Sequence, residues 1–178
     1  MKKLVFICLL LISVMANAQS VMGIKFGSSI ETVKRQLEQR LGEYSVIEEQ
    51  GMLQIWDFNM GNFHFDWGDF YFQYNGDNSY FNEVIFQCYS NVNDVNEMKA
   101  RRDYLYSLIK EKYEDDYLKE FTNKQGFKCY DFGTNPLDNS KILGQIVLRR
   151  GESKSGEEKL YLMLYYGPIY YIDKSSDF

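Results

Sequence analysis

The chain contains a single histidine, so His64 is the first residue to consider for acid–base chemistry. On a β-strand, His64 and Asp66 would share a face because side chains alternate between the two faces of a sheet. A histidine beside a carboxylate can serve as a general base with its orienting partner. A triad also needs a nucleophile, and no Gly-x-Ser-x-Gly elbow is present. The polar face of an edge strand explains both residues better, so a hydrolase around His64 and Asp66 is our least favoured hypothesis.

Three other patterns could carry chemistry, and each has a structural explanation. Asp66 and Asp69 could form a glycosidase carboxylate pair, but turns recruit Asp for local backbone hydrogen bonds. Gly27-Ser28-Ser29 could hold an anion at a helix start, yet Glu31 would oppose a negative ligand and capping explains the serines. The histidine and cysteines lack zinc-ligand spacing, and the aspartates follow no calcium-loop pattern. We therefore expect no metal site and no cofactor.

Residues 1–18 have the three parts of a secretory signal peptide. Lys2 and Lys3 form a positive n-region, residues 4–15 are apolar, and Ala16-Asn17-Ala18 is a small-x-small cleavage site. The apolar run is too short to span a bilayer, and no second run of spanning length follows. Cys8 lies within that run and follows Ile7, where a lipidation site needs a small residue. We expect residues 19–178 to form a single exported domain, periplasmic or extracellular.

Cys88 and Cys129 remain after such processing. An even pair of cysteines in an oxidising compartment favours a disulfide. This bridge would close a loop of about forty residues and contribute roughly 4 kcal/mol in the chain-entropy model. The alternative is a pair of buried thiols that act as small apolar side chains.

The composition is acidic and rich in aromatic residues. The net charge is −5, and it becomes more negative once Lys2 and Lys3 are removed. Nucleic acids and anionic membranes are therefore poor partners, because Lys and Arg supply most of the affinity for phosphate. Fifteen Tyr and thirteen Phe against two Pro favour many strands.

Two segments have the spacing and end signals of amphipathic helices. In the first, Ser28 is the expected N-cap, Glu31 completes a capping box and Gly42 provides the stop. Its apolar face consists of Ile30, Val33, Leu37 and Leu41. The second helix is expected to begin at Asp94, with Glu97 in the capping-box position, and to run to about Tyr113. Its apolar stripe consists of Val95, Met98, Leu105 and Ile109.

Strands are expected around these helices, at residues 23–27, 52–58, 63–67, 70–74, 80–89, 127–132, 141–150 and 159–166. Turn residues at 59–62 and 75–77 favour tight hairpins, Gly68 marks a turn or a bulge, and 151–156 is a polar hairpin loop. Helices segregated from runs of strands predict an α+β fold. We expect an antiparallel multi-stranded sheet with two helices on one face, arranged as two tandem αβ halves.

The segment Gly23-Ile24-Lys25-Phe26-Gly27-Ser28-Ser29, with Val33, Leu37 and Gly42, resembles small secreted proteins of Bacteroides-like bacteria. In those proteins such a segment opens a helix that ends near Gly, before a meander of strands. More distantly, the element order is similar to the two-layer build of the β-lactamase-inhibitor protein and of an outer-membrane assembly lipoprotein. The resemblance implies an α+β fold in a bacterial envelope setting, and it assigns no site residue.

The strands alternate between two kinds of side chain. One set is aliphatic or Phe and suits the face beneath the helices, whereas the other is rich in Tyr and suits a wet surface. Tyr-rich, partly apolar exposed faces are typical of interaction surfaces. The candidate binding residues on this face are Tyr71, Tyr89, Tyr130, Tyr161, Tyr165 and Trp67.

These observations favour a non-enzymatic domain that binds a protein partner, or a second copy of itself, through the Tyr-bearing face. The alternative is a carbohydrate-binding module with an exposed aromatic platform. Its platform residues would be Trp56, Trp67 and the tyrosines of residues 165–171.

Overall fold

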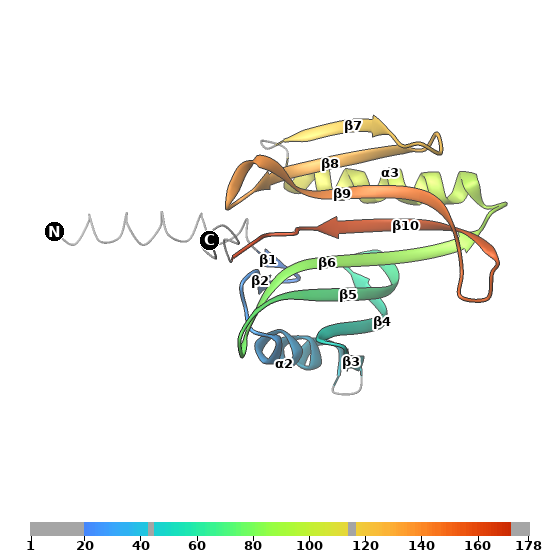
Figure 1. The fold of residues 1–178 in the computed structure, drawn as a ribbon. Helices are drawn as coiled ribbons and strands as arrows, with labels where there is room; N and C mark the ends of the chain where they lie inside the picture. Colours follow the sequence, from blue (N-terminus) through green and yellow to red (C-terminus); the bar gives the residue numbers. More distant parts are fainter. Residues whose placement is uncertain (1–19, 43–44, 114–116, 172–178) are drawn as a thin grey trace.

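The computed structural model describes residues 20–42, 45–113 and 117–171 (Figure 1). Within these ranges the chain forms two α-helices, a large eight-stranded antiparallel sheet and a separate two-stranded hairpin. The expected α+β composition with an antiparallel sheet is thus confirmed. The predicted signal peptide, residues 1–18, lies outside the described residues.

The elements follow one another in a simple order. They are β1 (Ser20–Val21), β2 (Ile24–Lys25), α2 (Ile30–Leu41), β3 (Val46–Glu49), β4 (Met52–Met60), β5 (Phe63–Asn75), β6 (Asn78–Asn91), α3 (Val95–Lys112), β7 (Leu118–Thr122), β8 (Lys128–Asn135), β9 (Asp138–Glu152) and β10 (Glu158–Tyr166). The order in the large sheet is β3-β4-β5-β6-β10-β9-β8-β7. Each helix therefore precedes a meander of four strands, and the two meanders meet where β6 pairs with β10 (Figure 1).

The α2 helix buries the apolar face that its sequence predicts. Ile30, Val33 and Leu37 are buried, and Gly42 ends the helix with a positive φ of 102°. The N-cap is Ser29, one residue later than predicted, and its hydroxyl accepts a hydrogen bond from the Thr32 N–H. Ser28 cannot begin the helix because its carbonyl oxygen accepts the Phe81 N–H of β6 at 2.8 Å.

The α3 helix begins after Asp94, as predicted, but without a capping box. The Asp94 side chain makes no cap hydrogen bond and instead accepts the Ser90 hydroxyl at 2.6 Å. Met98, Leu105 and Ile109 are buried, as the apolar spacing predicts. The same stripe also contains a residue that the apolar pattern omits, the buried Arg102.

Residues 63–67 and 70–74 form one continuous strand, β5, rather than the two predicted strands. Gly68 is neither a turn nor a bulge, because it pairs with Ile55 and with Phe86, and the register of β5 with β6 shifts between Tyr71 and Phe72. Gly68 instead leaves room for a core ring, because a Cβ atom at this position would lie 2.8 Å from Phe86 Cδ1. A glycine inside a strand can therefore mark a place where a large side chain of a neighbouring strand packs closely.

The two edge strands, β3 and β7, are short and were not among the predicted strands. β3 has the sequence Val-Ile-Glu-Glu, with one buried residue, and β7 exposes Lys119 and Glu120. Both edges form ion pairs with neighbouring elements: Lys34 of α2 contacts Glu48 at 3.0 Å, and Lys128 of β8 contacts Glu120 at 3.0 Å. Neither segment has the alternation of apolar and polar residues that identifies a half-buried strand.

The predicted disulfide is absent, because Cys88 and Cys129 are both buried free thiols. Cys88 lies on β6 and Cys129 on β8, and β10 and β9 separate these two strands. Three inter-strand spacings amount to about 14 Å. A disulfide requires Cα atoms within roughly 7 Å of one another. Burial raises the pKa of the Cys88 thiol to about 12 and also raises the pKa of Cys129.

Candidate functional site: an aromatic groove on the open face of the sheet

Strand β10 shows how the two faces of the large sheet differ. Leu160, Leu162 and Leu164 are fully buried in the hydrophobic core, to which both helices contribute. Tyr161 and Tyr165 alternate with them and therefore lie on the opposite face. We call this opposite side of the sheet the open face.

Four aromatic side chains form a row on the open face, across β4, β5, β6 and β10. The ring centroids are 6.1 Å apart for Trp56 and Trp67, 5.7 Å for Trp67 and Tyr89, and 6.3 Å for Tyr89 and Tyr161. Successive rings are inclined by 46°, 49° and 42°. We call these residues the aromatic row.

The register of the sheet builds the aromatic row. Trp56 is the direct cross-strand partner of Trp67, and Tyr89 is the direct partner of Tyr161. Trp67 pairs with Gln87, two residues from Tyr89, so its contact with Tyr89 is diagonal. Long aromatic side chains reach across such diagonal positions. The aromatic row remains accessible to solvent, because 48% of the Trp56 surface and 46% of the Tyr89 surface is exposed.

A polar network lies next to the aromatic row. The Gln54 amide donates a hydrogen bond to one carboxylate oxygen of Asp69 at 2.7 Å, and the Gln87 amide donates to the other at 3.3 Å. Asp69 is only 7% exposed. Among the described residues it has no ion-pair partner, so the two amides stabilise its charge. Each glutamine is thereby held in one orientation, with its amide carbonyl oxygen still able to accept a hydrogen bond.

The row and the network line a cavity of about 800 Å³, which we call the aromatic groove. Arg149 of β9 and the turn between β9 and β10 complete its lining. This hairpin projects from the sheet (Figure 1), and its turn is the polar loop that the sequence predicts. The charged lining residues balance in sign: Asp69, Glu152 and Glu157 against Arg149, Lys154 and Lys159. The groove is thus close to neutral although the chain is acidic.

Three of the six predicted binding residues meet in the aromatic groove: Trp67, Tyr89 and Tyr161. Tyr165 lies further along β10 and borders a different cavity. Tyr71 of β5 is the cross-strand partner of Glu83 of β6 and lies outside the groove lining. Burial raises the pKa of both Tyr71 and Tyr165.

The prediction for Tyr130 is wrong, because this side chain is buried beneath α3. Its ring stacks on Tyr106 of α3, and Tyr113 at the end of α3 contacts Phe132, two residues along β8. The alternation of β8 therefore has the opposite phase from the one predicted. Burial, with a hydrogen bond to Asp103, raises the pKa of Tyr130 to about 12.

Sequence reasoning did not identify the Gln54–Asp69–Gln87 network as a unit. Its members lie on three different strands, and only the register brings them together. By sequence alone Asp69 is a candidate catalytic carboxylate, and neither glutamine is assigned a role. The available signal was their alternation with buried neighbours, which assigns a face but no partner.

The residues considered for acid–base chemistry occupy a different place. His64 Nε2 lies 3.6 Å from an Asp57 oxygen and 3.8 Å from an Asp66 oxygen, on a partly exposed surface. The Asp66 carboxylate also accepts a hydrogen bond from the Tyr89 backbone N–H at 2.8 Å. It thus takes the place of the backbone carbonyl oxygen that would accept this bond in a regular strand ladder. His64 does not line the aromatic groove.

No family model matches the chain, and no curated protein or solved structure is significantly similar to it. Within the described ranges, no group of three or more His, Cys, Asp or Glu residues is arranged to hold a metal ion. No helix among the described residues is both long and apolar enough to cross a bilayer.

Proposed function

We propose that the chain is an exported, non-enzymatic binding domain that holds a neutral oligosaccharide in the aromatic groove. The observation that carries this proposal is the aromatic row beside the Gln54–Asp69–Gln87 network. The row offers ring faces to the apolar C–H face of a sugar, and the network offers oriented hydrogen-bonding groups to its hydroxyls. Ligand sites commonly combine such an apolar lining with a few fixed polar groups.

The charge balance of the groove supports a neutral ligand. Three acidic and three basic side chains line the cavity, and Lys159 is neutralised locally by Glu157 at 3.0 Å. An anionic ligand would lie close to Asp69, which has no ion-pair partner among the described residues and is nearly buried. Sugar hydroxyls can donate hydrogen bonds to the carboxylate and to the two glutamine carbonyl oxygens without this cost.

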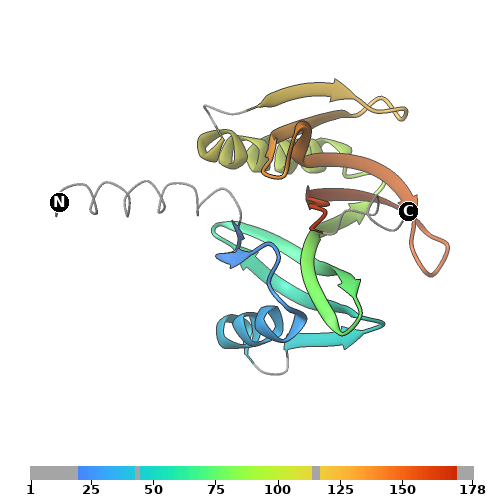
Figure 2. The same ribbon diagram turned by 60° about the vertical axis from the view of Figure 1, so that its left-hand side comes forward.

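The arrangement of layers also supports binding on the open face. We infer that α2 and α3 cover the same face as two tandem halves, since α2 contacts β3, β4 and β6 and α3 contacts β8, β9 and β10 (Figure 2). Both helices contribute to one core that contains the β10 leucines. The aromatic row is then left for a ligand from solution.

A protein partner, or a second copy of the chain, is the second candidate. The half-exposed Trp56 and Tyr89 favour it, because Trp and Tyr are enriched at the centres of protein interfaces. A stable complex would have to bury roughly 800 Å² on each partner. The hollow shape and the polar network at the row favour the oligosaccharide.

The test is a thermal-shift measurement with cellohexaose, xylohexaose, mannohexaose, maltohexaose and laminarihexaose. A ligand at one hundred times its Kd stabilises the folded protein by about 2.7 kcal/mol, which raises the Tm measurably. We expect at least one hexasaccharide to raise the Tm, and we expect Trp67→Ala and Tyr161→Ala to abolish the effect. Tyr104→Ala removes an exposed aromatic side chain from α3 and is the matched control, so the ligand should still raise the Tm of this variant. The absence of any shift across the panel would reject the oligosaccharide and leave the protein partner.

A further inference from the structure

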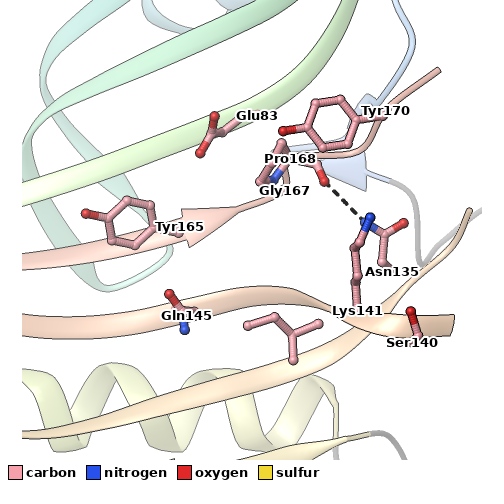
Figure 3. Close-up of a pocket in the computed structure, with 10 residues that line it drawn as sticks. Glu83, Asn135, Ser140, Lys141, Gln145, Tyr165, Gly167, Pro168 and Tyr170 are labelled. Atoms are coloured by element: carbon pink, nitrogen blue, oxygen red, sulfur yellow. Dashed lines mark hydrogen bonds between the residues drawn. The ribbon is translucent and has the colours of Figure 1, made fainter. Parts of the chain in front are cut away.

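A second cavity, of about 480 Å³, opens on the same face of the sheet (Figure 3). Glu83 of β6, Gln145 of β9 and Tyr165 of β10 border it from three neighbouring strands, and Tyr170 closes one side. The two cavities lie at opposite ends of the β6–β10 pair. Tyr89 pairs with Tyr161 at the groove end, whereas β6 and β10 end their pairing at Val84 and Tyr166, next to Glu83.

The second cavity repeats the chemistry of the aromatic groove. Gln145 donates a hydrogen bond to Asp131 at 2.7 Å, so its amide is fixed by a carboxylate, as Gln54 and Gln87 are fixed by Asp69. Tyr165 provides a ring, and its hydroxyl contacts Met163 Sδ at 3.1 Å. Each cavity thus combines a tyrosine of β10 with an oriented glutamine.

Glu83 provides the carboxyl group of the second cavity. It is partly buried, and no hydrogen bond or ion pair joins its side chain to another described residue. Burial raises its pKa, with no positive group opposing the shift. Lys141 provides the ammonium group in this lining, and that group is held by Asp138 at 3.0 Å and lies 5.9 Å from the Tyr170 ring centroid. A carboxyl group without a partner in a cavity is suited to a ligand that supplies hydroxyl groups.

The topology relates the two cavities to each other. Each half of the chain is a helix followed by four strands, and β6 and β10 are the last strands of the two halves. Because these strands are antiparallel neighbours, an approximate two-fold axis between them exchanges the two ends of the pair. A site formed near one end of β6 therefore has a counterpart near the opposite end of β10.

We propose that the second cavity is a second subsite for the same oligosaccharide chain, an inference that rests on the proposed function. The oligosaccharide follows the β6–β10 pair from Tyr161 to Tyr165, past Gln87 and the buried Met163 on the open face. Four residue-to-residue steps along the strand separate the two tyrosines, which is about 13 Å. A disaccharide therefore contacts the aromatic groove alone, and a longer chain contacts both cavities.

The experiment is a calorimetric titration with the disaccharide and the hexasaccharide of each series in the panel, cellobiose and cellohexaose for example. We expect the hexasaccharide to bind at least about ten-fold more tightly than the disaccharide, because the second contact is intramolecular. Tyr170→Ala and Glu83→Gln should remove this advantage and leave the affinity for the disaccharide unchanged. Tyr170 is 53% exposed, so its substitution tests the cavity without a risk to the core.

The outcomes separate this inference from the proposed function. If the hexasaccharide keeps its ten-fold advantage in Tyr170→Ala and in Glu83→Gln, the second subsite is wrong and the aromatic groove remains the binding site. Equal affinities of both sugars for the unaltered protein would also overturn the second subsite alone. If neither sugar of any series binds, the proposed function fails and the subsite fails with it. Tyr104→Ala serves again as the control and should bind as the unaltered protein does.

Discussion

The ring of Tyr130 lies parallel to the ring of Tyr106, with centroids 3.8 Å apart and an angle of 7° between the planes. This stack joins β8 to α3. Arg102 of α3 completes the contact, because its guanidinium lies 5.9 Å from the Tyr130 ring centroid and donates a hydrogen bond to the Lys128 carbonyl oxygen. The tyrosine that we expected on the open face is thus part of the helix–sheet interface.

Substitution of Arg102 should weaken this interface. Its Nε and Nη2 atoms donate to Asp103 at 2.9 and 2.7 Å, and Asp103 also accepts the Tyr130 hydroxyl. We expect Arg102→Ala to lower the free energy of unfolding by about 1.5–3 kcal/mol, the usual range for a hydrogen bond to a charged group. Arg102→Lys should recover only part of it, because an ammonium cannot reproduce the fork of donors. Urea denaturation measures the effect, and Lys99→Ala on the exposed side of α3 should be close to neutral.

Leu37 tests the packing of α2. Its side chain is fully buried between the helix and the sheet. We expect Leu37→Ala to cost roughly 2–5 kcal/mol, from lost burial and the cavity that remains. The measurement is the midpoint and slope of chemical denaturation, compared with Gln39→Ala on the exposed side of the same helix. A midpoint that matches the control would mean that α2 does not pack on the sheet as described.

Glu83 should make stability depend on pH. Burial raises the pKa of Glu83 in the folded state above its ordinary value of 4.5. Its stabilising contribution is complete below that value and is lost as the pH rises through the folded-state pKa. The unfolding free energy of Glu83→Gln, relative to the unaltered protein, should therefore increase between about pH 4 and pH 7. Thermal denaturation of both proteins across this range measures the difference, and a difference that stays constant with pH would contradict the prediction.

The two buried thiols should be inaccessible in the folded protein. The pKa of Cys88 is raised to about 12 by burial, so the reactive thiolate is scarce at neutral pH. We expect N-ethylmaleimide to leave Cys88 and Cys129 unmodified in the native protein and to modify both after denaturation without reductant. Peptide mass mapping identifies the sites. Modification that requires prior reduction would show that the cysteines are bridged.

The sequence predicted the helices well because caps and apolar spacing are local properties. Leu37 and Met98 are buried where a period of 3.6 residues places them. The N-cap of α2 is one residue later than predicted because the Ser28 carbonyl oxygen accepts a hydrogen bond from Phe81, more than fifty positions away in the chain. Local patterns carry no information on such a contact.

The binding face was predicted in part for the same reason. Alternation placed Tyr89 and Tyr161 on the open face, but only strand register shows that they form a row with Trp56 and Trp67. Alternation failed for β8, where a cysteine and a tyrosine compete for the buried positions. Tyr130 has an apolar ring and a polar hydroxyl, so it suits either face.

The short, charged edge strands have a consequence for how the protein behaves at high concentration. An open sheet offers unpaired backbone groups along its two outer strands, and neighbouring molecules can extend it there. β3 and β7 present Glu48, Glu49, Lys119 and Glu120 at those borders over only a few residues. A second molecule that approached edge to edge would have to desolvate these charges. The sheet is thus protected against growth from molecule to molecule, and the protein should resist β-type aggregation.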